Sequence, residues 1–100
     1  MLRHLMNLTE LRVIKSDERG IMYDCDKLNF ISRKKGSVSA NHSHSDHEIL
    51  YLVKGEVELT LGNETTRVVA PVKIDIPGGT FHKLVALSDI EILEDREYDK

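Results

Sequence analysis

Cysteine and tryptophan are almost absent from this chain, which has one cysteine, Cys25, and no tryptophan among its 100 residues. A single thiol excludes an internal disulfide framework and cannot supply a zinc site built from several thiolates. Any metal ion that the chain binds would therefore be held by histidine and carboxylate side chains. We interpret Cys25 as a small core residue of a strand rather than as a reactive thiol.

Long apolar runs and a large excess of one charge are absent too. No segment approaches the roughly 18 consecutive apolar residues of a membrane span, and residues 1–13 carry charge every few positions. We therefore expect a soluble, cytoplasmic protein with no membrane partner. The formal net charge is −3, with acids and bases mixed along the chain, which argues against nucleic acid as a partner. The basic cluster Arg33-Lys34-Lys35 is interpreted as a solvated turn.

Helical periodicity could exist only in the first dozen residues, and the remainder has β-type patterns. Short segments rich in β-branched and aromatic residues alternate with turn residues. Residues 56–69 alternate apolar and polar side chains, pass through Gly62-Asn63 and start again, which predicts a hairpin. About eight to ten short strands are expected, as in an all-β sandwich or closed barrel. With no linker or repeat visible, we expect a single domain over residues 1–100.

Polar residues that bind metals interrupt this β pattern between His42 and Glu48. Burying imidazoles and a carboxylate costs several kcal/mol unless each finds a partner, and a metal ion satisfies them together. If residues 40–55 form one strand with a bend at Ser45-Asp46, then His42, His44 and Glu48 share one face. His47 then faces outward and is expected at the surface or in an interface. A fourth ligand could come from His82, on the strand expected over residues 80–87.

Two motifs built on these residues resemble those of the cupin superfamily. The run GSVSANHSHSDHEILYLVKG, residues 36–55, matches the first cupin motif: a glycine, five residues, His-x-His, three residues, Glu, six residues and a glycine. PGGTFH, residues 77–82, matches the core of the second motif, Pro-x-Gly-x-x-His. In its flanks, Pro71 replaces an expected glycine and Ala86 an expected asparagine.

The resemblance implies a double-stranded β-helix, or jelly-roll barrel, with its metal-binding motifs within residues 36–86. It also implies that one divalent ion, which could be Mn, Fe, Ni, Co, Cu or Zn, is held by His42, His44, Glu48 and His82. Glycines such as Gly55 and Gly62 are interpreted as turn residues that need a positive φ. We expect the pocket around the ion to be lined by Val38, Ala40, Leu50, Leu52 and Leu84.

Cupins include isomerases, epimerases and dioxygenases as well as proteins that only bind ligands, so the reaction stays open. One hypothesis is an enzyme in which the ion polarises a carbonyl of a sugar or keto-acid derivative. A second is an iron-dependent dioxygenase, and a third is a non-catalytic module that binds or senses a small molecule. For a general base, only weak candidates exist: Tyr23, Asp24 and Lys27, on strands before the first motif.

Two further expectations concern the N-terminal part of the chain. The order of an Asp-Glu-Arg-Gly turn, a strand pair and the first motif resembles that of small cupins in nucleotide-sugar and capsular-polysaccharide metabolism. The same four residues also make a good hairpin turn, and we favour that structural interpretation. Small cupins pair through their outer sheet and N-terminal strands, and residues 8–15 supply apolar side chains for such a contact. We therefore expect a homodimer.

Overall fold

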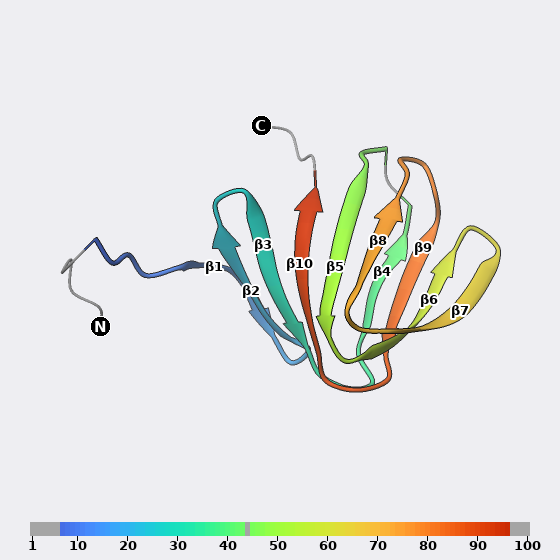
Figure 1. Cartoon of the computed structure of the whole chain (residues 1–100), viewed down its shortest axis with the longest axis horizontal. Coiled ribbons are helices and arrows are strands. Elements are labelled where there is room, and N and C mark those ends of the chain that lie inside the picture. The colour runs from blue at the N-terminus through green and yellow to red at the C-terminus, as the bar shows by residue number, and fades with distance from the viewer. Residues whose placement is uncertain (1–6, 44, 97–100) are drawn as a thin grey trace.

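The chain folds into two antiparallel sheets that face each other, as a jelly-roll barrel requires (Figure 1). The computed structural model describes residues 7–43 and 45–96. One sheet has the strand order β1-β2-β3-β10-β5-β8 and the other has the order β4-β9-β6-β7. The strands are β1 (Arg12–Asp17), β2 (Gly20–Cys25), β3 (Leu28–Arg33), β4 (Val38–His42), β5 (Glu48–Lys54), β6 (Glu56–Leu61), β7 (Glu64–Val69), β8 (Val72–Ile76), β9 (His82–Ala86) and β10 (Ile90–Arg96).

No helix occurs in the described ranges, and hence none there that is long and apolar enough to cross a membrane. Residues 1–6, which belong to the segment where a helix was considered, lie outside the described residues. The all-β prediction is confirmed for the rest, including the hairpin of residues 56–69, which forms β6 and β7. Its register closes from Leu61 to Glu64 around Gly62, whose φ is +60°.

Alternation along the strands builds the core between the two sheets. In β5 the side chains of Glu48, Leu50 and Leu52 are buried and those between them are more exposed, because successive residues point to opposite faces. The same alternation holds in β9 and β10. The buried apolar residues form one cluster. It comprises Ile31, Leu50, Leu52, Val57, Leu59, Ile74, Ile76, Leu84, Ala86, Ile90 and Ile92.

Gly55 closes the sharp connection between β5 and β6. Its φ is +96°, and a Cβ at this position would lie 2.4 Å from the carbonyl oxygen of Asp89. A side chain is therefore excluded by both the backbone conformation and the neighbouring loop. This explains the last glycine of the first motif as a structural requirement of the fold.

The basic cluster before Gly36 differs from the solvated turn that we expected. Lys34 and Lys35 are exposed, but Arg33 is the last residue of β3 and only 7% of its surface is accessible. Its position follows from strand alternation, because Ile31 and Arg33 point to the same face of β3. The barrel thus holds a buried arginine that the charge pattern did not reveal.

The N-terminal residues and β1 leave apolar side chains uncovered. Among the described residues β1 is an edge strand that pairs with β2, and residues 7–11 extend away from the sheets (Figure 1). Leu8, Leu11, Val13 and Ile14 have exposed fractions of 50%, 54%, 46% and 41%. The apolar surface expected at residues 8–15 is therefore present.

Candidate functional site

Three strands bring His42, Glu48 and His82 to one end of the barrel, which we name the site end. It is the end where β5 begins and β10 finishes, at the top of Figure 1. His42 and His82 are register partners on β4 and β9, with ring centroids 4.9 Å apart and planes at 74°. The Nε2 atom of His82 lies 3.4 Å from Oε1 of Glu48.

The strand assignment behind this cluster differs from our expectation. Residues 40–55 do not form one bent strand, because β4 ends at His42 and β5 begins at Glu48. The expected bend at Ser45-Asp46 is present, but the chain there passes from one sheet to the other. His42 and Glu48 therefore reach the site end from different sheets, and their shared parity in the sequence is not the cause.

A register shift in β4 places His42 opposite His82. Val38 pairs with Val85 and Ser39 with Leu84, but the next pair is His42 with His82, so β4 carries one extra residue. Because of this shift, Val38 and His42 do not share a face, and Val38 is 41% exposed. The expectation that Val38 lines the interior is wrong.

His82 and Glu48 are buried, whereas His42 lies at the exposed rim. The exposed fractions of His82 and Glu48 are 0% and 4%. The Nδ1 atom of His82 lies 3.2 Å from the carbonyl oxygen of Thr80. Since a carbonyl only accepts hydrogen bonds, the proton of a neutral His82 ring resides on Nδ1, and the lone pair of Nε2 is directed toward Glu48. A histidine that binds a metal ion through Nε2 needs this tautomer.

Glu94 is a further acid at the site end, and our sequence analysis missed it. It follows Ile90 and Ile92 on the inner face of β10, is 7% exposed, and accepts a hydrogen bond of 3.1 Å from Nδ2 of Asn29. Strand parity in IEILEDR would have indicated an inward carboxylate at this position.

The carboxyl groups of Glu48 and Glu94 are both buried and interact with each other. Burial, together with the hydrogen bond and negative charge of Glu94, raises the pKa of Glu48 to about 8. A buried carboxyl pair of this kind is neutralised either by a proton or by a cation. Its electrostatics therefore suit a divalent ion.

The loop between β4 and β5 is fastened to both neighbouring elements. Arg96 donates from Nε to Oδ2 of Asp46 over 2.6 Å, which anchors the loop to the end of β10. A Cβ at Gly78 would lie 2.2 Å from the carbonyl oxygen of Ser45, so only glycine permits this close approach of the 77–79 turn. The loop and the turn that flank the two histidine strands are held together.

The predicted four-residue ligand set is only partly visible. His44 lies outside the described residues, and residues 7–43 and 45–96 contain no group of three histidine, cysteine or acidic side chains already placed to hold an ion. The 3.4 Å between Nε2 of His82 and Oε1 of Glu48 is about the separation of two donors that each lie 2.0–2.2 Å from one ion. These donors fit a metal ion, and the full set stays a prediction.

The other candidates do not join the cluster of His42, Glu48 and His82. His47 is exposed and its Nε2 contacts Oδ1 of Asp75 at 2.5 Å, so its outward orientation is confirmed. Lys27 is exposed in the turn after β2, and Tyr23 stacks against Phe30 with ring centroids 6.3 Å apart. Asp24 forms an ion pair with Arg12. Strands β3 and β10 separate β2 from Glu48, so the structure does not bring these residues to the histidines.

A Cupin domain family model matches residues 29–94, a range that includes both motifs together with His42, Glu48, His82 and Glu94. The chain belongs to the cupin family. The resemblance found in the motifs and the jelly-roll fold that it implied are both confirmed.

Individual relatives show how far the similarity extends. An uncharacterized protein of Streptomyces coelicolor is 30% identical over 59 residues, which are 58% of this chain and 56% of that protein. The capsular polysaccharide assembling protein CapF of Staphylococcus aureus has a TM-score of 0.74 at 19% identity, over 92% of this chain and 30% of CapF. A cupin-2 domain of Rhodospirillum rubrum has a TM-score of 0.72 at 18% identity, over 91% of this chain and 72% of that one.

The chain thus spans about half the length of the curated relative and less than a third of CapF. At these identities the solved structures establish the fold alone.

Proposed function

We propose that this cupin binds one divalent metal ion at the site end through His42, His44, Glu48 and His82. The observation that carries the proposal is that His82, the register partner of His42, places its Nε2 atom 3.4 Å from Oε1 of the buried Glu48. Burying two neighbouring carboxyls without a cation is unfavourable, and imidazole nitrogens beside them complete a donor set typical of borderline divalent metals.

We further propose that the protein is an enzyme that acts on a small, oxygen-rich molecule, a sugar or keto-acid derivative. A bound ion would act as a Lewis acid that polarises a carbonyl of this substrate. Within the chain, Glu94 is the titratable group beside the ligand Glu48, and its hydrogen bond to Asn29 fixes its position. Glu94 therefore replaces Tyr23 and Lys27 as our candidate for holding or moving a proton.

The substrate class rests on the structural likeness to CapF, whose name assigns it to capsular polysaccharide assembly. The upstream turn adds nothing to this argument, because hydrogen bonds within the hairpin explain it. Asp17 accepts a bond of 2.9 Å from the backbone N of Arg19 and also pairs with the guanidinium of Arg19. As we expected, these residues are better explained as a turn.

A screen of substrates under two atmospheres tests the proposal. Sugar phosphates, nucleotide sugars, and keto and diketo acids are incubated with metal-loaded protein, with and without O₂. We expect turnover that does not need O₂ and that is lost in Glu48→Ala and His82→Ala but retained in His47→Ala. Turnover only with O₂ would favour a dioxygenase. No turnover, together with a ligand-dependent rise in melting temperature, would favour a non-catalytic binding module.

The exposed apolar side chains of residues 8–14 support a homodimer. The edge strand β1 exposes Val13 and Ile14, and Leu11 is exposed just before it. A second copy of the chain, related by a two-fold axis, can cover this apolar surface. Light scattering on the purified protein is expected to give twice the chain mass of 11.4 kDa. A monomer at micromolar concentration would exclude this arrangement.

A further inference from the structure

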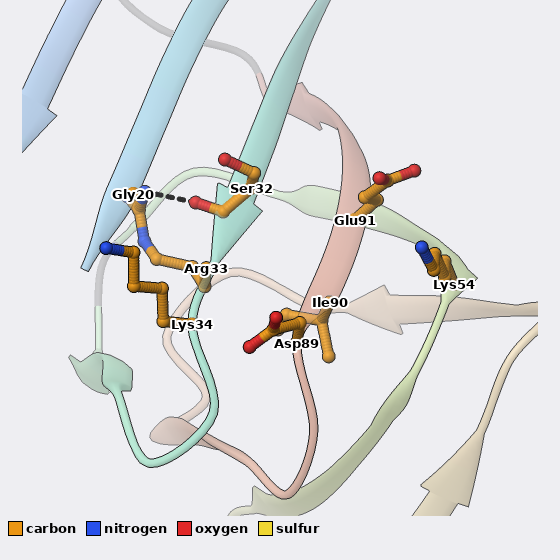
Figure 2. A pocket seen from close by; sticks show the side chains of 8 residues that line it. All are labelled: Gly20, Ser32, Arg33, Lys34, Lys54, Asp89, Ile90 and Glu91. Carbon is orange, nitrogen blue, oxygen red and sulfur yellow. Dashed lines mark hydrogen bonds between the residues drawn. The ribbon is translucent and has the colours of Figure 1, made fainter.

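A hollow lies at the end of the barrel opposite the site end. It has a volume of about 230 Å³ and is formed where β3 and β5 end and β10 begins (Figure 2). Its charged lining comes from three positive and two negative side chains, which are Arg33, Lys34, Lys54, Asp89 and Glu91. A hollow of this size accommodates a small ion or a short polar molecule.

Arg33 is the unusual member of this lining, because it is a buried cation with few partners. Figure 2 shows its side chain turned back along β3 toward Gly20, where Nη1 donates to the carbonyl oxygen of Ser32 over 3.0 Å. The Nε atom is buried and has no hydrogen-bond partner among the described residues. Within the same residues, no carboxylate forms an ion pair with this guanidinium.

A buried guanidinium in this state is energetically unfavourable, and burial lowers the pKa of Arg33. Arginine remains charged in proteins, so the cost of burying this charge is not relieved by the loss of a proton. A buried charge that a protein retains is normally matched by a counter-ion or a ligand. Arg33 therefore points to an anion that the described chain does not itself provide.

The charges of Asp17 and Glu94 act on Arg33 from a distance, but no nearby carboxylate of the described residues forms an ion pair with it. Asp17 is engaged by Arg19, with 2.8 Å between Nη2 and Oδ2. Asp89 is exposed and accepts a hydrogen bond of 2.9 Å from the backbone N of Lys35, which fixes the loop before β10. Glu91 is the register partner of Lys54 across the two strands.

We propose that this hollow, which we name the Arg33 pocket, binds a small oxyanion, either inorganic phosphate or the phosphate or carboxylate group of a metabolite. The guanidinium of Arg33 supplies paired N–H donors, which match the oxygens of such groups. Lys34 and Lys54, both exposed at the rim, add positive charge at the entrance. Asp89 and Glu91 can accept hydrogen bonds from hydroxyl groups on the rest of the molecule.

The Arg33 pocket is separate from the proposed metal site. On β10, Arg33 pairs with Ile90 whereas Glu48 pairs with Arg96, six residues further along. At the rise of a β-strand this separation is about 20 Å. The proposal can therefore fail or succeed independently of metal binding.

The test compares wild-type protein with Arg33→Gln, and uses Lys73→Gln as the control. Lys73 is exposed on β8 outside the pocket, so its replacement removes the same charge from the protein. Inorganic phosphate is titrated into metal-free protein at constant ionic strength, and amide chemical shifts and the melting temperature are recorded. A parallel titration with acetate shows whether a carboxylate is accepted as well.

We expect saturable shifts at Gly20, Ser32 and Ile90 in wild type and in Lys73→Gln. In Arg33→Gln the affinity should fall by about tenfold or more, because a charge-assisted hydrogen bond is lost. Without phosphate, Arg33→Gln should melt at the same or a higher temperature than wild type, since an uncompensated buried charge is removed. An arginine with a purely structural role would give a lower melting temperature and an unchanged phosphate affinity, and that result would overturn the proposal.

A second variant keeps the test decisive if Arg33→Gln does not fold. Lys34 and Lys54 are exposed, so their joint replacement by glutamine leaves the core intact. It should weaken phosphate binding about threefold or more through the loss of two nearby charges. Equal phosphate responses in all variants, or shifts confined to residues around His82, would overturn the proposal.

Discussion

The carboxyl pair of Glu48 and Glu94 should make the stability of the metal-free protein depend strongly on pH. The pKa of Glu48 is raised from its ordinary 4.5 to about 8 in the folded chain. Between these two values the folded state holds a proton that the unfolded state has released. The free energy of unfolding therefore falls as pH rises through this window, and the contribution of the proton is fully present only below pH 4.5.

The size of the effect follows from the shift. One pKa unit corresponds to about 1.4 kcal/mol, so the full displacement corresponds to on the order of 5 kcal/mol. The two carboxyls titrate as a pair, which makes this value an upper bound for one residue. Between pH 5 and 7 the metal-free protein should lose about 2 kcal/mol or more of its stability from this source alone.

Urea unfolding in the presence of a chelator measures this dependence, with Glu48→Gln as the matched control. Glutamine has nearly the same shape and does not titrate, so the difference in unfolding free energy between wild type and the variant isolates the carboxyl pair. We expect this difference to fall steadily from pH 5 to pH 8. Adding a divalent ion should abolish the decline and release about one proton at pH 7. A difference that is flat or rises with pH would refute the assignment.

Four further substitutions test the fold and the dimer. Gly55→Ala should lower the free energy of unfolding by about 2–4 kcal/mol because its Cβ would collide with Asp89, whereas Gly62→Ala, with nothing within 4 Å, should cost about 1 kcal/mol from its positive φ alone. Equal losses by urea denaturation would contradict this reasoning. Leu52→Ala, at a site 1% exposed, should cost about 2–5 kcal/mol by the same assay, and a loss below 1 kcal/mol would show that the core is not packed as described. Leu11→Asp should convert the proposed dimer to monomer in light scattering, and an unchanged dimer would place the interface elsewhere.

The sequence predicted the fold because its strands alternate between side chains that face solvent and side chains that face the core. Residues 56–69 show the reason: the alternation and the Gly62-Asn63 turn are local signals, and the hairpin β6–β7 follows from them. The motifs likewise indicated the residues that meet at the site end. Such local patterns can be interpreted without knowing which strands are neighbours.

What the sequence did not predict depends on register and on contacts between distant segments. The extra residue in β4 puts Val38 and His42 on opposite faces of the strand. Nothing in the order of amino acids marks a bulge there. Arg33 was assigned to a solvated turn and Glu94 was missed, because charged residues near strand ends are usually exposed. Only the strand pairing of β3 and β10 shows that both are buried.

Metal occupancy of the reconstituted protein tests the central proposal most directly. Wild type, His82→Ala and His47→Ala are loaded separately with Mn, Fe, Co, Ni, Cu and Zn, desalted, and measured for bound metal per chain by elemental analysis. We predict about one equivalent of at least one metal in wild type and in His47→Ala, and a large loss in His82→Ala. The reason is that His82 belongs to the proposed ligand set and His47 does not. Less than about a tenth of an equivalent of every metal in folded wild-type protein, or equal losses in the two histidine variants, would contradict the assignment of the metal site.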